Sequence, residues 1–128
     1  MPSKTVNKIT GSRSDELTLH FYEVLDRHME EVVEGKALKL FEVQDMAEKL
    51  YVHPIHLSNT IKETTGKSPC DIYEEKLIEI AKDLLQNPDK AIADVAIQLT
   101  YDPSNFTKFF KKMEGITPKQ YRQKIKLK

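Results

Sequence analysis

The chain has 128 residues, 39% of them apolar, and its 20 basic and 20 acidic side chains give a formal net charge of zero. That size allows one domain, or two very small ones that share an interface. No run approaches the ~18 apolar residues of a membrane-spanning helix, and the polar N-terminus lacks the apolar segment of a signal peptide. The single cysteine, Cys70, excludes a disulfide framework, so we expect a reducing, cytoplasmic location.

The charge is unevenly distributed along the chain. Residues 104–128 contain eight basic residues and one acidic residue, Glu114, so this end carries +7 and residues 1–103 carry −7. A basic end on a neutral chain is typical of a polyanion partner, but a solvated lysine-rich tail has the same composition. Charge alone leaves both interpretations open.

The hydrophobic periodicity predicts helices throughout. Residues 1–14 show no periodicity and are predicted to be disordered. An apolar stripe then predicts a helix over Leu17–Val32, capped by Ser14 or Asp15 and ended by Gly35. Further helices are predicted over 43–50, 54–65, 69–85, 92–99 and 103–113, and from Pro118 into the basic tail. No segment alternates as a strand does, so the predicted fold class is all-α with about seven helices.

A repeat lies within this pattern. Segments 43–73 and 92–122 align without a gap, 49 residues apart, with seven identities in 31 positions. The identical pairs are Asp45/Asp94, Ala47/Ala96, Leu50/Leu99, Pro54/Pro103, Lys62/Lys111, Gly66/Gly115 and Pro69/Pro118. Most are small, apolar or backbone-determining residues, so one supersecondary unit is predicted to occur twice.

Each copy has the pattern of a helix-turn-helix. A short helix carries an alanine where a second helix must cross closely, and a turn of about three residues leads to a helix that starts with proline. Asp102 can cap the second of these helices, whereas His53 at the matching position is a poorer cap. The predicted organisation is a disordered segment 1–14, a first helix-turn-helix subdomain 15–68, a linker helix 69–86, a second subdomain 87–122 and a basic tail 123–128.

The outward positions of the proline-started helices are mostly short, polar or basic, as a helix in the DNA major groove requires. Acidic residues come only at their far ends, at Glu63 and Glu114. Helical hairpins also occur that only pack, so this pattern favours DNA binding without excluding a packing role.

Three segments carry a family resemblance: MAEKLYVHPIHLSNTIKETTGKSP (46–69), IAKDLL (80–85) and VAIQLTYDPSNFTKFFKKMEGITPKQYR (95–122). Together they resemble the DNA-binding region of the AraC/XylS family of bacterial transcription regulators. The resemblance covers about two-thirds of the chain and is most specific in the last segment.

The resemblance implies seven helices, with two helix-turn-helix units joined by a long linker helix. Each unit has a recognition helix, and the two recognition helices enter successive major grooves of double-stranded DNA. It further implies that a monomer reads an asymmetric site and recruits RNA polymerase as an activator. By analogy, the residues facing bases are Ile55, His56, Ser58, Asn59, Ser104, Asn105, Thr107 and Lys108. The residues meeting phosphates are Lys62, Lys67, Lys111 and Lys112.

The chain departs from the family pattern in several places. The second turn begins with Thr100 where glycine is common, and Asn59 stands where many members carry arginine. The first recognition helix therefore offers no arginine–guanine contact. Most members carry a further domain ahead of this region, so the chain is either a short regulator or a fragment of a longer one.

Other chemistry is not expected. His53 and His56 lack the further ligands of a metal site, and no catalytic constellation or cofactor motif is present, so we expect neither an enzyme nor a cofactor. The aromatic residues from Phe106 to Tyr121 are predicted to be core, with Phe109 the most exposed, and Tyr51 and Tyr101 to cover the hairpin cores. The alternative function is a protein-interaction adaptor or antagonist that keeps the fold, and the oligomeric state stays open.

Overall fold

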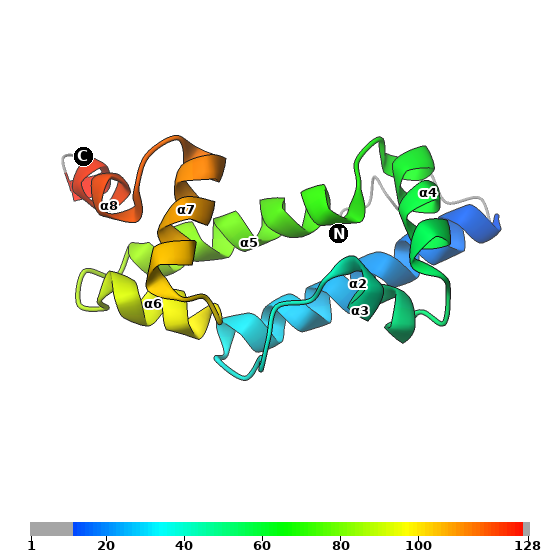
Figure 1. Ribbon diagram of the computed structural model, residues 1–128, viewed down its shortest axis with the longest axis horizontal. Coiled ribbons are helices and arrows are strands. Elements are labelled where there is room, and N and C mark those ends of the chain that lie inside the picture. The colour runs from blue at the N-terminus through cyan, green and yellow to red at the C-terminus, as the bar shows by residue number, and fades with distance from the viewer. Residues whose placement is uncertain (1–11, 127–128) are drawn as a thin grey trace. The chain divides into compact units, whose positions relative to one another are not determined.

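The computed structural model describes residues 12–126, and within that range the chain forms helices and no strands. The seven helices are α2 (Arg13–Val33), α3 (Val43–Lys49), α4 (Pro54–Thr65), α5 (Pro69–Leu85), α6 (Ile92–Gln98), α7 (Pro103–Glu114) and α8 (Pro118–Lys126) (Figure 1). The predicted all-α class is confirmed. None of the described helices combines the length and the apolar character that crossing a membrane requires.

The start of the described range corrects one prediction. Helix α2 already begins at Arg13, because the Ser12 hydroxyl accepts a hydrogen bond from the Asp15 N–H at 3.1 Å and so caps the first turn. The end of the segment predicted to be disordered is therefore helical, and the rest of that prediction, residues 1–11, lies outside the described residues. At the other end, α8 runs from Pro118 to Lys126 and so enters the basic tail 123–128, as predicted.

Proline and glycine set the helix boundaries. Helices α4, α5, α7 and α8 each begin at proline, whose missing N–H would have no intrahelical partner at that position. Helices α4 and α7 are followed by Gly66 and Gly115, with φ of +80° and +83°. This left-handed conformation, which glycine adopts without strain, ends both helices at the same position of the repeat.

The described chain divides into two compact units. One unit holds the residues up to Met29 together with Phe41–Glu74, and the other holds Glu30–Leu40 together with the residues from Glu75 onward. Helices α2 and α5 therefore each contribute residues to both units. Each unit contains one copy of the repeat.

The first unit is built on α3 and α4. Its core is apolar and includes Phe21 and Leu25 of α2, Met46 of α3, and Leu57 and Ile61 of α4, all fully buried. These residues follow the helical stripes predicted from the sequence.

A buried polar group lies beside this core. His28 is 2% exposed, and its ring stacks on Phe41 at a centroid distance of 3.8 Å. The Tyr73 hydroxyl lies 2.9 Å from His28 Nε2 and accepts the Phe41 N–H at 3.0 Å. These hydrogen bonds pair the Tyr73 hydroxyl with His28 Nε2 and with the Phe41 N–H, polar groups that burial would otherwise penalise.

The second unit is more aromatic. Its fully buried residues include Phe106 and Phe110 of α7 and Val95, Ala96 and Leu99. The ring centroids of Phe106 and Phe110 lie 5.9 Å apart. Tyr121 of α8 meets Phe110 edge-on at 5.4 Å, an arrangement that aromatic quadrupoles favour.

Polar side chains join the helices of this unit. Arg122 of α8 donates through Nε to the Leu85 carbonyl at 3.0 Å and through its terminal nitrogen to the Asn87 carbonyl at 3.1 Å. It therefore caps the C-terminus of α5. Lys82 of α5 lies 3.5 Å from both Glu79 and Glu114. Burial lowers the pKa of Lys82, but the two carboxylates outweigh burial, so the pKa is raised above its ordinary value.

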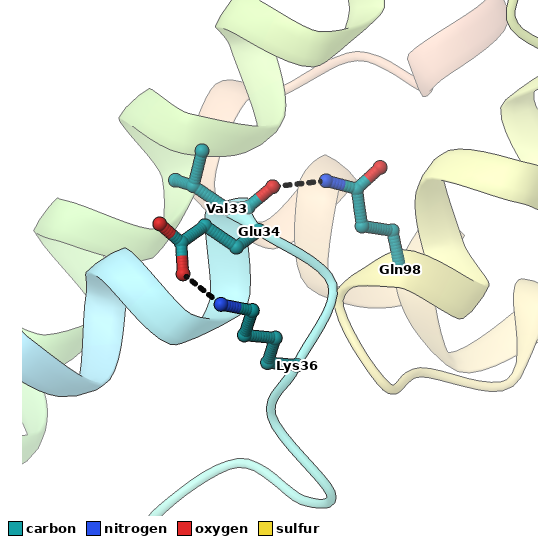
Figure 2. Close-up of polar contacts among 4 residues, drawn as sticks. All are labelled: Val33, Glu34, Lys36 and Gln98. Carbon is teal, nitrogen blue, oxygen red and sulfur yellow. Dashed lines mark hydrogen bonds and ion pairs between the residues drawn. The ribbon is translucent and has the colours of Figure 1, made fainter.

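The last turn of α2 is tied to α6 within the same unit. Figure 2 shows the Gln98 side-chain amide donating to the Val33 carbonyl at 2.7 Å. Lys36 pairs with Glu34 at 3.3 Å in the segment that follows. The Gln98 bond satisfies a carbonyl that lacks an intrahelical partner at the end of α2.

Candidate nucleic-acid interface

The two helix-turn-helix units have the same dimensions. Helices α3 and α6 have 7 residues each, and α4 and α7 have 12 residues each. Ala47 and Ala96 are buried at the matching position of the short helices, as the predicted close crossing requires. The repeat found in the sequence is thus a repeat of structure.

The matching extends to the backbone of the turns. Tyr51 and Thr100 occupy the same position of the repeat and have φ of 57° and 64°. They are the two non-glycine residues with positive φ in the described chain. The family's common glycine fits this left-handed conformation without strain, whereas a tyrosine and a β-branched threonine store strain there.

The caps of α4 and α7 differ. The Asp102 carboxylate accepts from the Ser104 and Asn105 N–H groups at 3.0 and 3.4 Å and from the Ser104 hydroxyl at 3.0 Å. The Ser104 hydroxyl and these N–H groups lower the pKa of Asp102. His53 Nδ1 accepts one bond, from the Ile55 N–H at 3.1 Å. Since Nδ1 accepts, the neutral ring carries its proton on Nε2.

The predicted base-facing residues lie on the surface of both recognition helices. On α4, Ser58 is half-buried and the exposed residues are Ile55, His56 and Asn59. On α7, Thr107 is half-buried and the exposed residues are Ser104, Asn105 and Lys108. The hydroxyl proton of Thr107 is bonded to the Pro103 carbonyl at 3.1 Å, so toward a base this side chain offers a lone pair and a methyl group.

The predicted phosphate contacts are also exposed. Lys62, Lys67, Lys111 and Lys112 all reach solvent, and Lys62 and Lys111 occupy the same position near the end of α4 and of α7. Exposure is a requirement for DNA contact, and the contacts themselves stay predictions.

Two predictions about aromatic side chains are wrong. Phe109 is 7% exposed, because Tyr101 stacks on it at 5.3 Å with an interplanar angle of 23°. Tyr51 is 95% exposed, so its side chain does not cover the hairpin core. Tyr101 does cover its hairpin core, as predicted.

The sequence pattern predicts no structural role for Arg122 or Gln98. Both act through hydrogen bonds to carbonyls 35 or more positions away. The Tyr-Arg pair at 121–122 belongs to the segment that carries the family resemblance, and in the structure Arg122 caps α5. Gln98 left no signal, because its partner is a backbone atom.

Residues 46–124 match the family described as a helix-turn-helix domain, which is more than half of the chain. The chain belongs to the AraC-type helix-turn-helix family of transcription regulators. The matched region runs from Met46, within α3, into α8, so it includes most of the first helix-turn-helix unit and all of the second.

Known proteins agree with this assignment. Over 82 residues, 63% of this chain, the regulator is 38% identical to the HTH-type transcriptional regulator YtdP of Bacillus subtilis. The C-terminal domain of AraT, a response regulator from Geobacillus stearothermophilus, superposes with a TM-score of 0.73 at 27% identity, covering 88% of each chain. The DNA-binding domain of AdpA, solved with a target DNA, has the same fold, with a TM-score of 0.67 at 21% identity over 80% of this chain and 89% of that one.

The curated relatives are much longer than the matching region. The aligned part covers 11% of YtdP, and between 28% and 41% of four other relatives. The chain therefore spans less than half the length of each of these relatives.

Proposed function

We propose that the chain is a sequence-specific DNA-binding regulator that reads two adjacent major grooves, one with α4 and one with α7. The observation that carries this proposal is the paired construction of the two helix-turn-helix units, each with an exposed, acid-poor recognition helix. Helices entering successive major grooves on one side of a duplex are about 34 Å apart, so the site has two blocks one helical turn from each other.

The two helices contribute different chemistry to recognition. On α7, Asn105 and Lys108 offer hydrogen-bond groups to base edges, with Asn suited to adenine and Lys to guanine. Lys111 and Lys112, one turn further on, pair with phosphates and hold the helix in register without reading sequence. Because α4 presents other side chains, the two blocks differ and the site is asymmetric.

AdpA supports this proposal, because its domain shares the fold and was solved in complex with a target DNA. The basic C-terminal end of the chain supports it too, since cationic side chains that replace condensed counterions supply much of the affinity for duplex DNA.

The rest of the proposal concerns regulation. One chain binds the asymmetric site as a monomer, in the cytoplasm, and activates transcription by recruiting RNA polymerase. It acts through binding alone, without catalysis. A reporter with the selected site placed upstream of a weak promoter tests the sign: expression should rise when the chain is present and should fall to background with a scrambled site.

The DNA proposal is tested by selecting bound sequences from a random duplex library at two salt concentrations. Two enriched, dissimilar blocks about ten base pairs apart support the two-groove reading. A single enriched block limits sequence reading to one helix. No enrichment, with binding that vanishes at moderate salt, contradicts the proposal.

A second candidate is an adaptor or antagonist that binds another protein. It is favoured by exposed apolar side chains away from the recognition helices, at Leu38 (98% exposed) and Ile97 (63% exposed), and by the zero net charge. Binding to a regulator protein with no enrichment of DNA sequences would select this candidate.

A further inference from the structure

Ile55 is an unusual residue for the surface it occupies. It lies in the first turn of α4 and is 65% exposed, although large apolar side chains are mostly buried in this chain. The matching position of α7 holds Ser104, whose hydroxyl is already engaged with Asp102. The two recognition helices thus present different chemistry at the same place.

The backbone at Ile55 is fixed. Its N–H donates to His53 Nδ1 at 3.1 Å, and Pro54 before it fixes the first helical position. An isoleucine in a helix also has one strongly preferred χ1 rotamer, so an apolar contact made there is not offset by a large ordering cost.

The position faces the same way as the other predicted reading residues. Ser58 and Asn59 lie three and four positions further along α4 and so share its face. The N-terminal residues of a helix-turn-helix recognition helix are the ones that contact base edges. An isoleucine has no hydrogen-bonding group, and the apolar feature that a major groove presents is the C5-methyl group of thymine.

We propose that the first recognition helix reads thymine through apolar contact between Ile55 and the thymine C5-methyl group. This inference rests on the proposed function. It accounts for the exposed Ile55 and gives the first helix a means of reading sequence without the arginine that it lacks. The first block of the site then contains a thymine that is recognised through its methyl group, while the second block is recognised through hydrogen bonds from α7.

The decisive experiment changes only that methyl group. Each thymine of the first block of the selected site is replaced in turn by deoxyuridine, which keeps base pairing and lacks the methyl. Affinity of the full chain is measured by fluorescence anisotropy at one salt concentration. One replacement should weaken binding about fourfold, the fold-change for removing one buried methyl-sized group.

Two variants separate this contact from general effects. I55S carries the residue of the second repeat, and its affinity should be the same for thymine and deoxyuridine. I97S removes a similarly exposed isoleucine from α6, outside the recognition helices, and should keep the fourfold difference. Circular dichroism checks that both variants remain helical, and the wild-type measurement stands even if one does not fold.

The outcomes distinguish this inference from the proposed function. An enriched two-block site whose first block has no thymine, or is insensitive to every deoxyuridine replacement, overturns the inference and leaves the function standing. Sensitivity that persists in I55S assigns the methyl contact to another residue and also overturns it. No enriched sequence at all overturns both.

Discussion

The residues with positive φ allow a prediction in which two substitutions change the free energy of unfolding in opposite directions. Tyr51 and Gly115 both have left-handed backbones, with φ of 57° and 83°. Replacing Tyr51 by Gly should stabilise the first unit, because it removes strain from a turn that the fold imposes. Replacing Gly115 by Ala should destabilise the second unit by introducing the same strain.

The structure restricts both effects to the backbone. The Tyr51 side chain is 95% exposed, so its removal costs no buried contact, and a Cβ atom added to Gly115 meets nothing within 4 Å. A non-glycine residue in the left-handed conformation costs ~1–2 kcal/mol. The greater freedom of glycine in the unfolded chain offsets ~0.4–1 kcal/mol of that. Each substitution should therefore change the free energy of unfolding by about 0.5–1 kcal/mol, in opposite directions.

Thermal unfolding followed by circular dichroism measures both changes. A domain of ~60–100 residues shifts its Tm by ~4–8 °C per kcal/mol, so we expect shifts of about 2–8 °C. Glu48→Gly, inside α3 where φ is negative, is the control and should lower Tm, because glycine weakens a helix interior. A lower Tm for Tyr51→Gly would refute the reasoning, because it would mean that the tyrosine stabilises the turn.

Three further predictions concern the second unit. Arg122→Lys should destabilise the protein by about 1–3 kcal/mol, because an ammonium group cannot span two carbonyls as a guanidinium does. Urea unfolding measures this change. The control is Lys124→Ala, a nearby surface substitution that should have little effect on the free energy of unfolding. Asp102 has a pKa lowered from 3.8, so its contribution to stability is complete above that value and is lost as the pH falls through the folded-state pKa. Between pH 6 and pH 2.5 the Tm of Asp102→Asn should therefore fall less than that of wild type, and equal slopes would contradict this. Lys108→Ala should alter the base preference in the second block of the DNA site. Lys111→Ala should weaken the affinity for all DNA sequences alike and reduce the slope of affinity against salt concentration by about one unit. Unchanged affinity and base preference for Lys108→Ala would show that α7 is wrongly positioned.

The helices could be predicted from local signals. Proline starts, glycine stops and apolar stripes act within a few residues, so the bounds of α3, α4 and α7 agree with the sequence to within about one position. The start of α2 was missed, because the cap is Ser12 rather than Ser14 or Asp15.

Contacts between distant parts of the chain could not be predicted. The group formed by His28, Phe41 and Tyr73 joins residues up to 45 positions apart, and nothing in the local pattern of any one of them specifies the other two. The same holds for Arg122, whose acceptors are backbone atoms and have no sequence signature.

For the candidate site, the repeat and the family resemblance predicted which helices carry it, and the 3.6-residue period predicted which side chains point outward. The conformation of Tyr51 could be inferred only from its match to Thr100 and the family's glycine. Which bases each side chain reads depends on the bound DNA, so those assignments stay predictions.

The equal lengths of α4 and α7 have a consequence for how such a protein can change its target. The inward residues of the two helices differ, with Leu57 and Ile61 in one and Phe106 and Phe110 in the other, and each pair fits its own core. The outward residues lie on two helices of equal length, each of which begins at a proline and is followed by a glycine. Their side chains can therefore be transplanted from one helix to the other without repacking either core. Under the proposed two-groove function, surface substitutions made one at a time would convert a protein that binds two unlike blocks into one that binds a direct repeat.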